Sequence, residues 1–291
     1  MDMKKGGLSE VQDAFWELVD KSEAAAEKAE ANYSAEQHKV WDLVANNLHS
    51  LWFLFVHPAL LKAGEKMGMF SGNIPTVKSL DKILSAASGF HVYVCDGVLD
   101  FAVLAYGYSM GYFPTTLFIR TMAQLDYIET PDMVHERFGH LVALFLKAYA
   151  NAVKQFGKIA LNYLDHEECV KALDKIHWWG VEFPLVWHEG QIKVVGPGIL
   201  SSPGEITHAV KASRHLDTGE QIQRITVTNE NAFEVLMDIV KGPKHNIHIF
   251  QSKYLVFENF EVFEHTLTKT VVLVMQEIKK EGVVVPYDDP Q

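Results

Sequence analysis

The amino-acid sequence predicts a mainly α-helical protein of the α+β class, in which one helical domain carries a few short strands. Three observations favour this class: apolar residues recur at helical spacing over long stretches, strand-like patterns are few and short, and Pro and Gly are scattered rather than gathered in a linker. At 291 residues the chain is long enough to bury a sizeable core. We therefore expect one domain that spans residues 1–291.

The helices are predicted from apolar spacing and from cap residues. Apolar residues at helical spacing from Leu8 to Leu18 predict a first helix over residues 8–32. Ser34 followed three residues later by Gln37 is a capping-box pattern, and it predicts a second helix that ends near Pro58. Further helical patterns cover residues 78–87, 101–112, 115–124, 132–155, 166–183, 205–213 and 263–280.

The strands are predicted from short runs of β-branched and aromatic residues. Their ranges are His91–Val94, Gln191–Val195, Arg224–Val227 and Tyr254–Phe257. The tract 242–250 holds His245 and His248, but no carboxylates or cysteines accompany them as a ligand set. We therefore expect a loop that leads into the last strand rather than a metal site.

Composition and charge exclude several classes of partner. The chain has 26 Lys and Arg against 37 Asp and Glu, a formal net charge of -11, so its field repels the phosphates of nucleic acids and anionic lipids. No apolar run approaches the roughly 20 residues that span a bilayer, and the N-terminal residues lack a signal-peptide pattern. We expect a cytoplasmic protein without nucleic-acid or membrane partners.

The two cysteines, Cys95 and Cys169, are far apart and form no C-x-x-C motif. Neither a disulfide framework nor a thiolate metal site can be built from them, so we expect two buried, reduced thiols. Any metal must then be bound through His and carboxylate groups.

Two histidines lie inside one predicted helix, in the segment TPDMVHERFGHLVALF (130–145). His135 and His140 are five residues apart, which on an ideal helix places them about 140° apart, so a shared metal requires a helix end, a π-type widening or a bend. Gly139 could ease such a distortion. The spacing differs by one residue from the H-E-x-x-H motif of zinc proteases. Taken alone, two histidines in one helix are more often packing or surface residues than metal ligands.

Glu182 lies between Val181 and Phe183, in an apolar stretch where an unpaired carboxylate is costly to bury. It therefore needs a cation, which could be a buried Arg or Lys or a metal ion. Two His and one carboxylate form the facial triad that is typical of Fe(II) oxygenases, because it leaves coordination positions open.

Three segments resemble the pterin-dependent aromatic amino acid hydroxylases, the family of phenylalanine, tyrosine and tryptophan hydroxylases. They are Tyr33–Trp41 (YSAEQHKVW), TPDMVHERFGH and WWGVEFPLV…GPGILSSPGEI (178–206). The likeness covers about residues 33–260, in the family's order, and leaves 1–32 as an N-terminal helix and 261–291 as a C-terminal helix and tail. It implies a catalytic domain like that of phenylalanine 4-hydroxylase.

The resemblance also implies roles for individual residues. His135, His140 and Glu182 would be the catalytic iron ligands. Arg120 would bind the substrate's α-carboxylate through its bidentate fork, and Ser201, followed by Ser202, would support a ligand histidine and that carboxylate. Pro131, Trp178 and Phe183 would form walls of the aromatic substrate pocket, and Asp132 and Tyr127 match positions near the same loop.

On the pterin side the chain departs from the family. Glu136 matches an acid that faces the pterin, and Gly97, Leu99 and His177 stand at other positions that line it. Leu104, however, stands where the family has a stacking Phe, and His177 where it has an aromatic. Gly180 and Ile128 replace family threonines, the second beside the substrate carboxylate. The resemblance thus implies a divergent pterin pocket.

The implied function is an Fe(II)- and tetrahydropterin-dependent monooxygenase that uses O2 to hydroxylate an aromatic amino acid, with phenylalanine to tyrosine as the first choice. Its partners would be the small-molecule amino acid and O2. Three alternatives stay open: an oxygenase of the same fold with another substrate or reductant, a metal-dependent hydrolase with Glu136 as base, and a binding module without catalysis.

Overall fold

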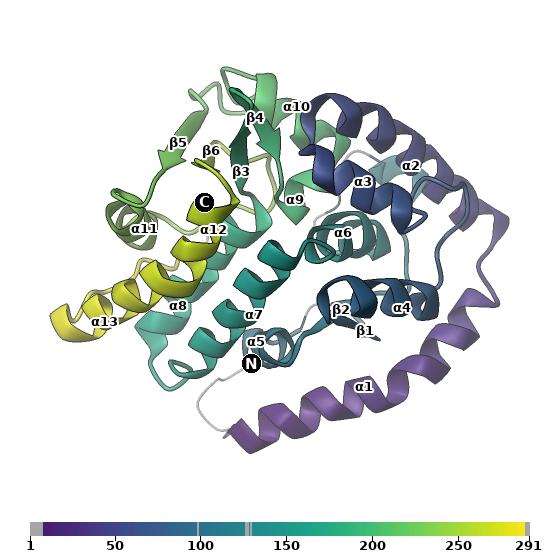
Figure 1. Cartoon of the computed structure of the whole chain (residues 1–291), viewed down its shortest axis with the longest axis horizontal. Coiled ribbons are helices and arrows are strands. Elements are labelled where there is room, and N and C mark those ends of the chain that lie inside the picture. The colour runs from purple at the N-terminus through teal and green to yellow at the C-terminus, as the bar shows by residue number, and fades with distance from the viewer. Residues whose placement is uncertain (1–7, 98, 126–127, 129, 289–291) are drawn as a thin grey trace.

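The computed structural model describes residues 8–97, 99–125, 128 and 130–288, and helices make up most of it (Figure 1). The α-helices are α1 (Leu8–Glu30), α2 (Ala35–Phe55), α3 (Pro58–Lys66), α4 (Val77–Ser88), α5 (Phe101–Met110), α6 (Val142–Leu144), α7 (Lys147–Leu161), α8 (Glu167–His177), α9 (Pro197–Leu200), α10 (Pro203–Lys211), α11 (Ala232–Lys241), α12 (Phe260–His265) and α13 (Val271–Glu281). The predicted fold class, mainly helical with short strands, is confirmed.

Among the described residues, three helical segments are π-helices: η2 (His135–Leu141), η3 (Trp178–Glu182) and η4 (Thr266–Thr270). A short 3-10 turn, η1, spans Met122–Gln124. In a π-helix each backbone hydrogen bond reaches five residues back instead of four, which is rare and often found at functional sites. Two of the three segments carry the candidate metal ligands.

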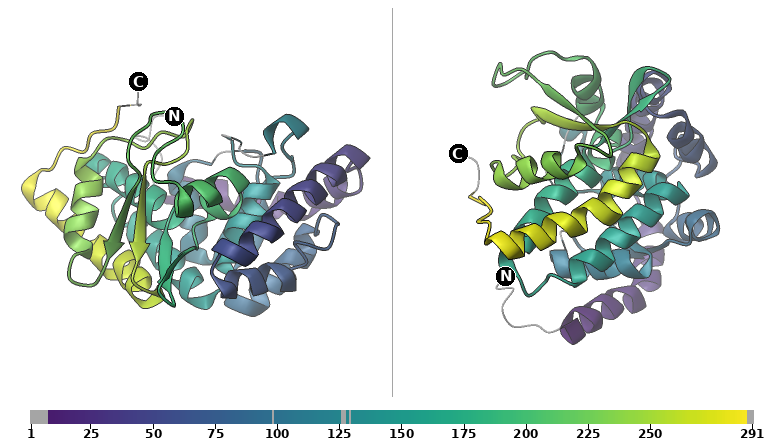
Figure 2. Two further views of the ribbon diagram at one scale, coloured as in Figure 1. Left: turned by 90° about the horizontal axis from the view of Figure 1, so that it is seen from above. Right: turned by 60° about the vertical axis from the view of Figure 1, so that its left-hand side comes forward.

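The strands are β1 (His91–Val94), β2 (Tyr112–Thr115), β3 (Leu185–His188), β4 (Gln191–Val194), β5 (Gln223–Val227) and β6 (Lys253–Phe257). One sheet has the order β4-β3-β6-β5, in which only β3 and β4 are antiparallel, and β1 pairs with β2 in parallel. Glu189 and Gly190 both have positive φ, as the tight turn of the β3–β4 hairpin requires. The four-stranded sheet and α1 lie at opposite sides of the molecule (Figures 1 and 2).

The N-terminal predictions are largely confirmed. The Ser34 hydroxyl accepts a hydrogen bond from the Gln37 backbone (3.2 Å) and the Gln37 side chain accepts one from the Ser34 backbone (2.8 Å), so the capping box is present. The second helix ends at Phe55. Helix α3 was not expected, because Pro58 was interpreted as a stop although it is the first residue of a new helix, where proline is well tolerated.

Other predictions were wrong in identifiable ways. Residues 115–124 were expected to be helical, but β2 ends at Thr115 and only the 3-10 turn follows. The predicted helix 132–155 is divided into η2, α6 and α7. Helix α11 and strands β2 and β3 were not expected. The four predicted strands and the loop 242–250 are all present, the strands within one residue of their expected bounds.

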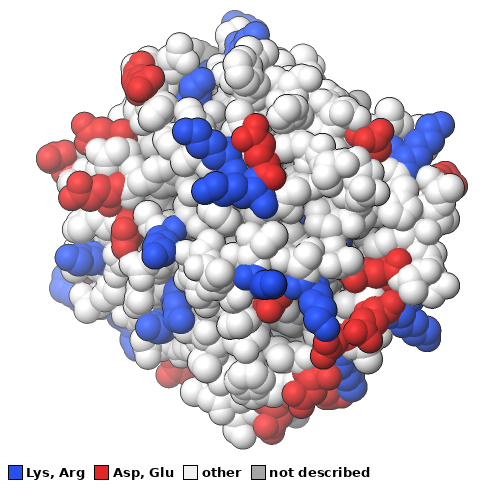
Figure 3. Space-filling view, turned by 45° about the vertical axis from the view of Figure 1, so that its right-hand side comes forward, with Lys and Arg blue, Asp and Glu red and all other residues white. Residues whose placement is uncertain are grey.

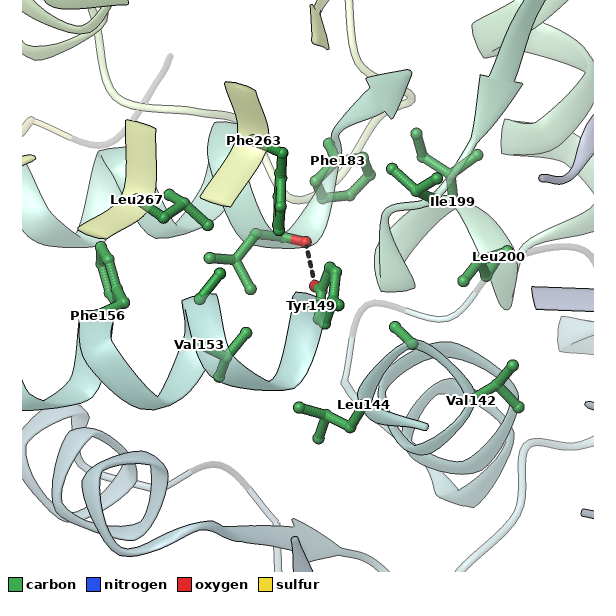
Figure 4. Packing of buried hydrophobic residues seen from close by; sticks show 14 of the residues in the cluster. Val142, Leu144, Tyr149, Val153, Phe156, Phe183, Ile199, Leu200, Phe263 and Leu267 are labelled. Carbon is green, nitrogen blue, oxygen red and sulfur yellow. Dashed lines mark hydrogen bonds between the residues drawn. The ribbon is translucent and has the colours of Figure 1, made fainter. Parts of the chain in front are cut away.

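The core brings α7 against both α5 and the segment that carries Glu182. Gly157 allows α7 to approach α5, because a Cβ there would lie 2.6 Å from the Ala105 carbonyl oxygen. On the other side the Tyr149 hydroxyl donates a hydrogen bond to the Val181 carbonyl (2.9 Å), and the Phe263 ring stacks on Tyr149 (Figure 4). These contacts fix the position of η3 relative to the central helices.

Acidic and basic side chains are intermingled on the face of the molecule shown in Figure 3. Within the described part of the chain, every helix is too short or too polar to cross a membrane. Cys95 and Cys169 are both buried and free, as expected.

Candidate metal centre and active-site cavity

The π-helix η2 explains how two histidines five residues apart face the same point. Because each turn of a π-helix holds more residues than a turn of an α-helix, positions five apart fall near one another on one face. The Nε2 atoms of His135 and His140 are 3.1 Å apart. Of the distortions that the spacing allowed, the structure contains the π-type widening.

Gly139 is required by the packing of η2. Helix α9 crosses η2 so closely that a Cβ at Gly139 would lie 2.7 Å from the carbonyl oxygen of Pro197. Real Cβ atoms do not come so near, so any side chain here would push α9 away. The glycine therefore places α9, which ends immediately before Ser201, directly behind the two histidines.

Glu182, at the end of η3, completes a group of three possible metal ligands. Its Oε1 is 3.0 Å from His140 Nε2, and its Oε2 is 3.7 Å from His135 Nε2. One ligand atom from each residue lies within 4.8 Å of the others. Two donors at right angles about one metal, on bonds of about 2.1 Å, are about 3.0 Å apart. The observed separations therefore fit adjacent positions of one coordination sphere.

The charges of these groups also fit a metal ion. Burial lowers the pKa of His135 to about 4 and the pKa of His140 to about 3, so both imidazoles are neutral at pH 7 and have a lone pair to donate. Among the described residues, Glu182 has no Lys or Arg within ion-pair distance. A buried carboxylate without a cation is costly, and a divalent metal supplies that cation.

Ser201 sets the tautomer of His135. The Ser201 hydroxyl donates its single hydrogen to the Pro197 carbonyl (2.9 Å), and its oxygen lies 3.2 Å from His135 Nδ1. The hydroxyl oxygen must therefore accept a hydrogen bond from Nδ1–H. This leaves the Nε2 lone pair of His135 directed at the other two ligands.

Arg120 and Asp132 form a buried ion pair beside this centre. The guanidinium donates through Nε (3.0 Å) and Nη2 (2.8 Å) to the two carboxylate oxygens, and both side chains are almost fully buried. Asp132 also accepts the backbone N–H of His135 (3.0 Å), which ties the pair to the start of η2. The third guanidinium nitrogen, Nη1, makes two long contacts with described residues, to the carbonyls of Leu125 (3.4 Å) and Ser201 (3.5 Å).

A cavity of about 300 Å³ opens onto the three ligand atoms. Every metal, substrate or cofactor candidate named from the sequence lines this cavity: Gly97, Leu99, Arg120, Pro131, His135, Glu136, His140, His177, Trp178, Glu182, Phe183 and Ser201. The divergent positions Leu104 and Ile128 line it too, whereas Tyr127 lies outside the described residues. The candidates come from five separate stretches of chain, so the fold brings them together.

Glu136 is buried at the cavity wall rather than solvated. Burial, and then the nearby carboxylates of Glu182 and Asp132, raise its pKa well above the usual value. Its Oε2 finds no hydrogen-bond partner within the described part of the chain. Buried polar atoms are rarely left so, and an orphaned oxygen beside a cavity indicates that a ligand supplies the missing bond.

Sequence reasoning did not find several cavity residues, among them Tyr108, Phe113 and Asp174. Phe113 stacks on the ring of His140, with centroids 4.4 Å apart. It lies on β2, a strand that was not expected, so no local pattern indicated it. His245 was noted but assigned to a loop, and its ring lies parallel to the indole of Trp178 at 4.0 Å. Only the fold brings that loop to the cavity.

Comparison with known proteins agrees with this arrangement. The model of the biopterin-dependent aromatic amino acid hydroxylases matches residues 11–288. The phenylalanine-4-hydroxylase of Vibrio cholerae is 23% identical over 270 residues, which are 93% of this chain and 88% of that protein. The tyrosine 3-monooxygenase of Caenorhabditis briggsae is 26% identical over 209 residues, 70% of this chain and 40% of that protein.

The fold agrees as well. A crystal structure of Chromobacterium violaceum phenylalanine hydroxylase, with bound iron(III) and 7,8-dihydrobiopterin, aligns with a TM-score of 0.74 at 23% identity and covers 90% of this chain and 88% of its own. The family model covers nearly the whole chain, and the resemblance found in the sequence is confirmed. This protein belongs to the biopterin-dependent aromatic amino acid hydroxylases.

Proposed function

We propose that this protein is an Fe(II)- and tetrahydropterin-dependent monooxygenase that hydroxylates phenylalanine to tyrosine, and that residues 1–291 act as one catalytic domain. The observation that carries the proposal is the convergence of two neutral imidazoles and one carboxylate at the wall of a cavity, where no Lys or Arg of the described residues lies within ion-pair distance of that carboxylate. That donor set is typical of non-haem Fe(II) oxygenases. Relatives named as phenylalanine-4-hydroxylases, over most of this chain, support the choice of substrate.

In this proposal His135, His140 and Glu182 hold the iron. The iron and the tetrahydropterin, when bound, supply the electrons and the O2 chemistry that no side chain can provide. The chain's own groups bind and orient. Ser201 fixes the His135 ring, and the Glu136 carboxyl is placed to hydrogen-bond a cofactor on the cavity wall.

The aromatic substrate would lie between apolar walls with its carboxylate at the polar end. Trp178 and Phe183 pack with ring centroids 4.6 Å apart and, with Pro131, line the cavity. Arg120 has one nitrogen, Nη1, that is not used by Asp132. A substrate carboxylate at that nitrogen would replace its long contacts with a charge-assisted hydrogen bond.

One experiment separates this function from its alternatives. The protein is loaded with Fe(II) without oxygen and then given O2, with and without a tetrahydropterin, in the presence of Phe, Tyr or Trp, and the products are identified by mass. We expect one added oxygen atom on Phe that depends on both O2 and the pterin. Hydroxylation that proceeds with another reductant would refute the pterin assignment, and hydrolysis that needs no O2 would support the hydrolase.

Arg120→Lys is expected to raise the KM for the amino acid by about tenfold or more. A point ammonium cannot both satisfy Asp132 in a planar, two-bond geometry and offer a further nitrogen to the substrate carboxylate. The measurement is steady-state kinetics together with a thermal melt. Arg224→Lys is the matched control, because Arg224 donates to the carbonyls of Ala209 and Ala212 away from the cavity. An unchanged KM in Arg120→Lys would contradict the carboxylate role.

Leu104→Phe is expected to tighten tetrahydropterin binding about two- to twelvefold. Leu104 lines the cavity, and a stacked aromatic pair contributes about 0.5–1.5 kcal/mol beyond its buried area. Binding is measured by calorimetry on the Fe(II) protein, with Leu104→Met as a control of similar size without a ring. Phe101 also lines the cavity, and if it already stacks on the pterin, the gain in affinity from Leu104→Phe would be smaller. Equal tightening by Met and Phe would show that stacking is not the cause.

A further inference from the structure

The second π-helix repeats the arrangement of the first. His177 precedes Glu182 by five residues, as His135 precedes His140, and η3 widens the chain between them. The Nε2 of His177 lies 3.7 Å from Oε1 of Glu182, the oxygen that is also 3.0 Å from His140 Nε2. Two widened turns therefore direct four donor groups, three imidazoles and a carboxylate, toward one cavity.

As it stands, His177 lies just outside the coordination sphere. Donors on opposite sides of one metal, on bonds of about 2.1 Å, are about 4.2 Å apart at most. The ligand atoms that lie within 4.8 Å of one another come from the other three residues, and His177 is not among them. Its Nε2 is nevertheless only 3.7 Å from one atom of that group, Oε1 of Glu182.

A hydrogen bond from Tyr108 holds His177 in this outer position. The Tyr108 hydroxyl is 3.0 Å from His177 Nε2, and the described residues offer this hydroxyl no other partner. A buried O–H requires an acceptor, so the hydroxyl donates its hydrogen into the Nε2 lone pair. That is the lone pair with which His177 would bind a metal. Tyr108 itself is 1% exposed and stacks against Phe113, so it has little freedom to turn away.

We propose that His177 is a fourth metal ligand held in reserve, and that the hydrogen bond from Tyr108 keeps it off the metal. This inference rests on the proposed function, in that the metal is bound by His135, His140 and Glu182. The role of Tyr108 is to preserve an open coordination position, because a site with three imidazoles and a carboxylate has one position fewer for oxygen and substrate. Tyr108 is thus a positioning residue that acts through His177.

Cobalt(II) binding to the whole chain tests the proposal, because the visible absorption of cobalt(II) changes with its coordination number and nitrogen donors. Tyr108→Phe removes the hydroxyl and keeps the ring. We expect it to bind cobalt(II) more tightly, on the order of tenfold by calorimetry, and to shift and intensify the visible spectrum. The double variant Tyr108→Phe/His177→Phe should lose both changes. Tyr106→Phe is the matched control, because its ring lies on the same helix but packs against Phe15.

Two results would overturn the proposal. The first is an unchanged affinity and spectrum in Tyr108→Phe, and the second is a change that persists in the double variant. His177→Phe alone provides an independent check, because a histidine that is not a ligand can be removed without altering the cobalt(II) spectrum. If Tyr108→Phe fails to fold, an altered spectrum in His177→Phe still refutes the reserve position. Cobalt(II) binding that survives Glu182→Ala would instead refute the metal centre on which the inference rests.

Discussion

We expect Glu182→Ala to abolish turnover and stoichiometric iron binding without destabilising the metal-free protein. Loss of a group that only supports a ligand weakens metal affinity roughly 10- to 100-fold, and loss of the ligand itself should exceed this. Ala at His135 or His140 should have the same effect, because all three donors form the site. Iron content and turnover are the measurements.

The metal-free melting temperature is the sharper test of Glu182. In the absence of metal its carboxylate is buried with no Lys or Arg nearby among the described residues, which costs free energy. Glu182→Ala should therefore melt at the same temperature as the metal-free wild type or higher, and it should gain nothing when iron is added. A variant that keeps full activity would contradict the ligand assignment.

Asp132→Ala should lower the free energy of unfolding by about 3–5 kcal/mol, which is a large part of the stability of most domains. The substitution leaves the Arg120 guanidinium charged and buried without its partner. It also removes the acceptor for the His135 backbone N–H. Urea unfolding of the metal-free protein, monitored by circular dichroism, measures the change.

The matched control replaces both partners of this pair. Arg120→Met/Asp132→Leu removes both charges together, and buried ion pairs exchanged for apolar residues are often neutral in stability. The double variant should recover much of the loss while its KM for the amino acid stays high. If the free energy of unfolding of Asp132→Ala lies within about 1 kcal/mol of the wild-type value, as for a surface substitution, the ion pair does not stabilise the fold.

More of the candidate site than of the surrounding fold could be predicted from the sequence. His135, His140 and Glu182 were found because a short motif records both residue type and spacing, and the π-helix has now accounted for the unusual interval. Tyr108 was not found, since its importance depends on a contact with His177, 69 residues away along the chain. No local sequence pattern can indicate a contact between residues so far apart along the chain.

The errors in the fold have local causes. Leu117, Phe118 and Ile119 form a continuous apolar run, which periodicity cannot assign to helix or strand. In the structure they belong to neither, and they follow β2, whose pairing with β1 ends at Thr115. Helix α11 was missed although its pattern is amphipathic: Glu234, Asp238 and Lys241 recur at helical spacing, and Leu236, Met237, Ile239 and Val240 are buried. Strands rich in β-branched and aromatic residues, such as β6, were assigned correctly because that composition fits a pleated, buried surface.

The widened turn at η2 also determines in which direction, about the helix axis, the side chains of the following helical residues point. Without Gly139 the segment would read His-Glu-Arg-Phe-His, whose two imidazoles lie four residues apart and share a face of an ordinary α-helix. The additional residue is therefore not needed to pair two histidines. What it changes is the direction of the next helical turn, by about 100°. His135, Glu136 and His140 line the cavity, whereas Val142, Ala143 and Leu144 of α6, which follow, are buried in the core.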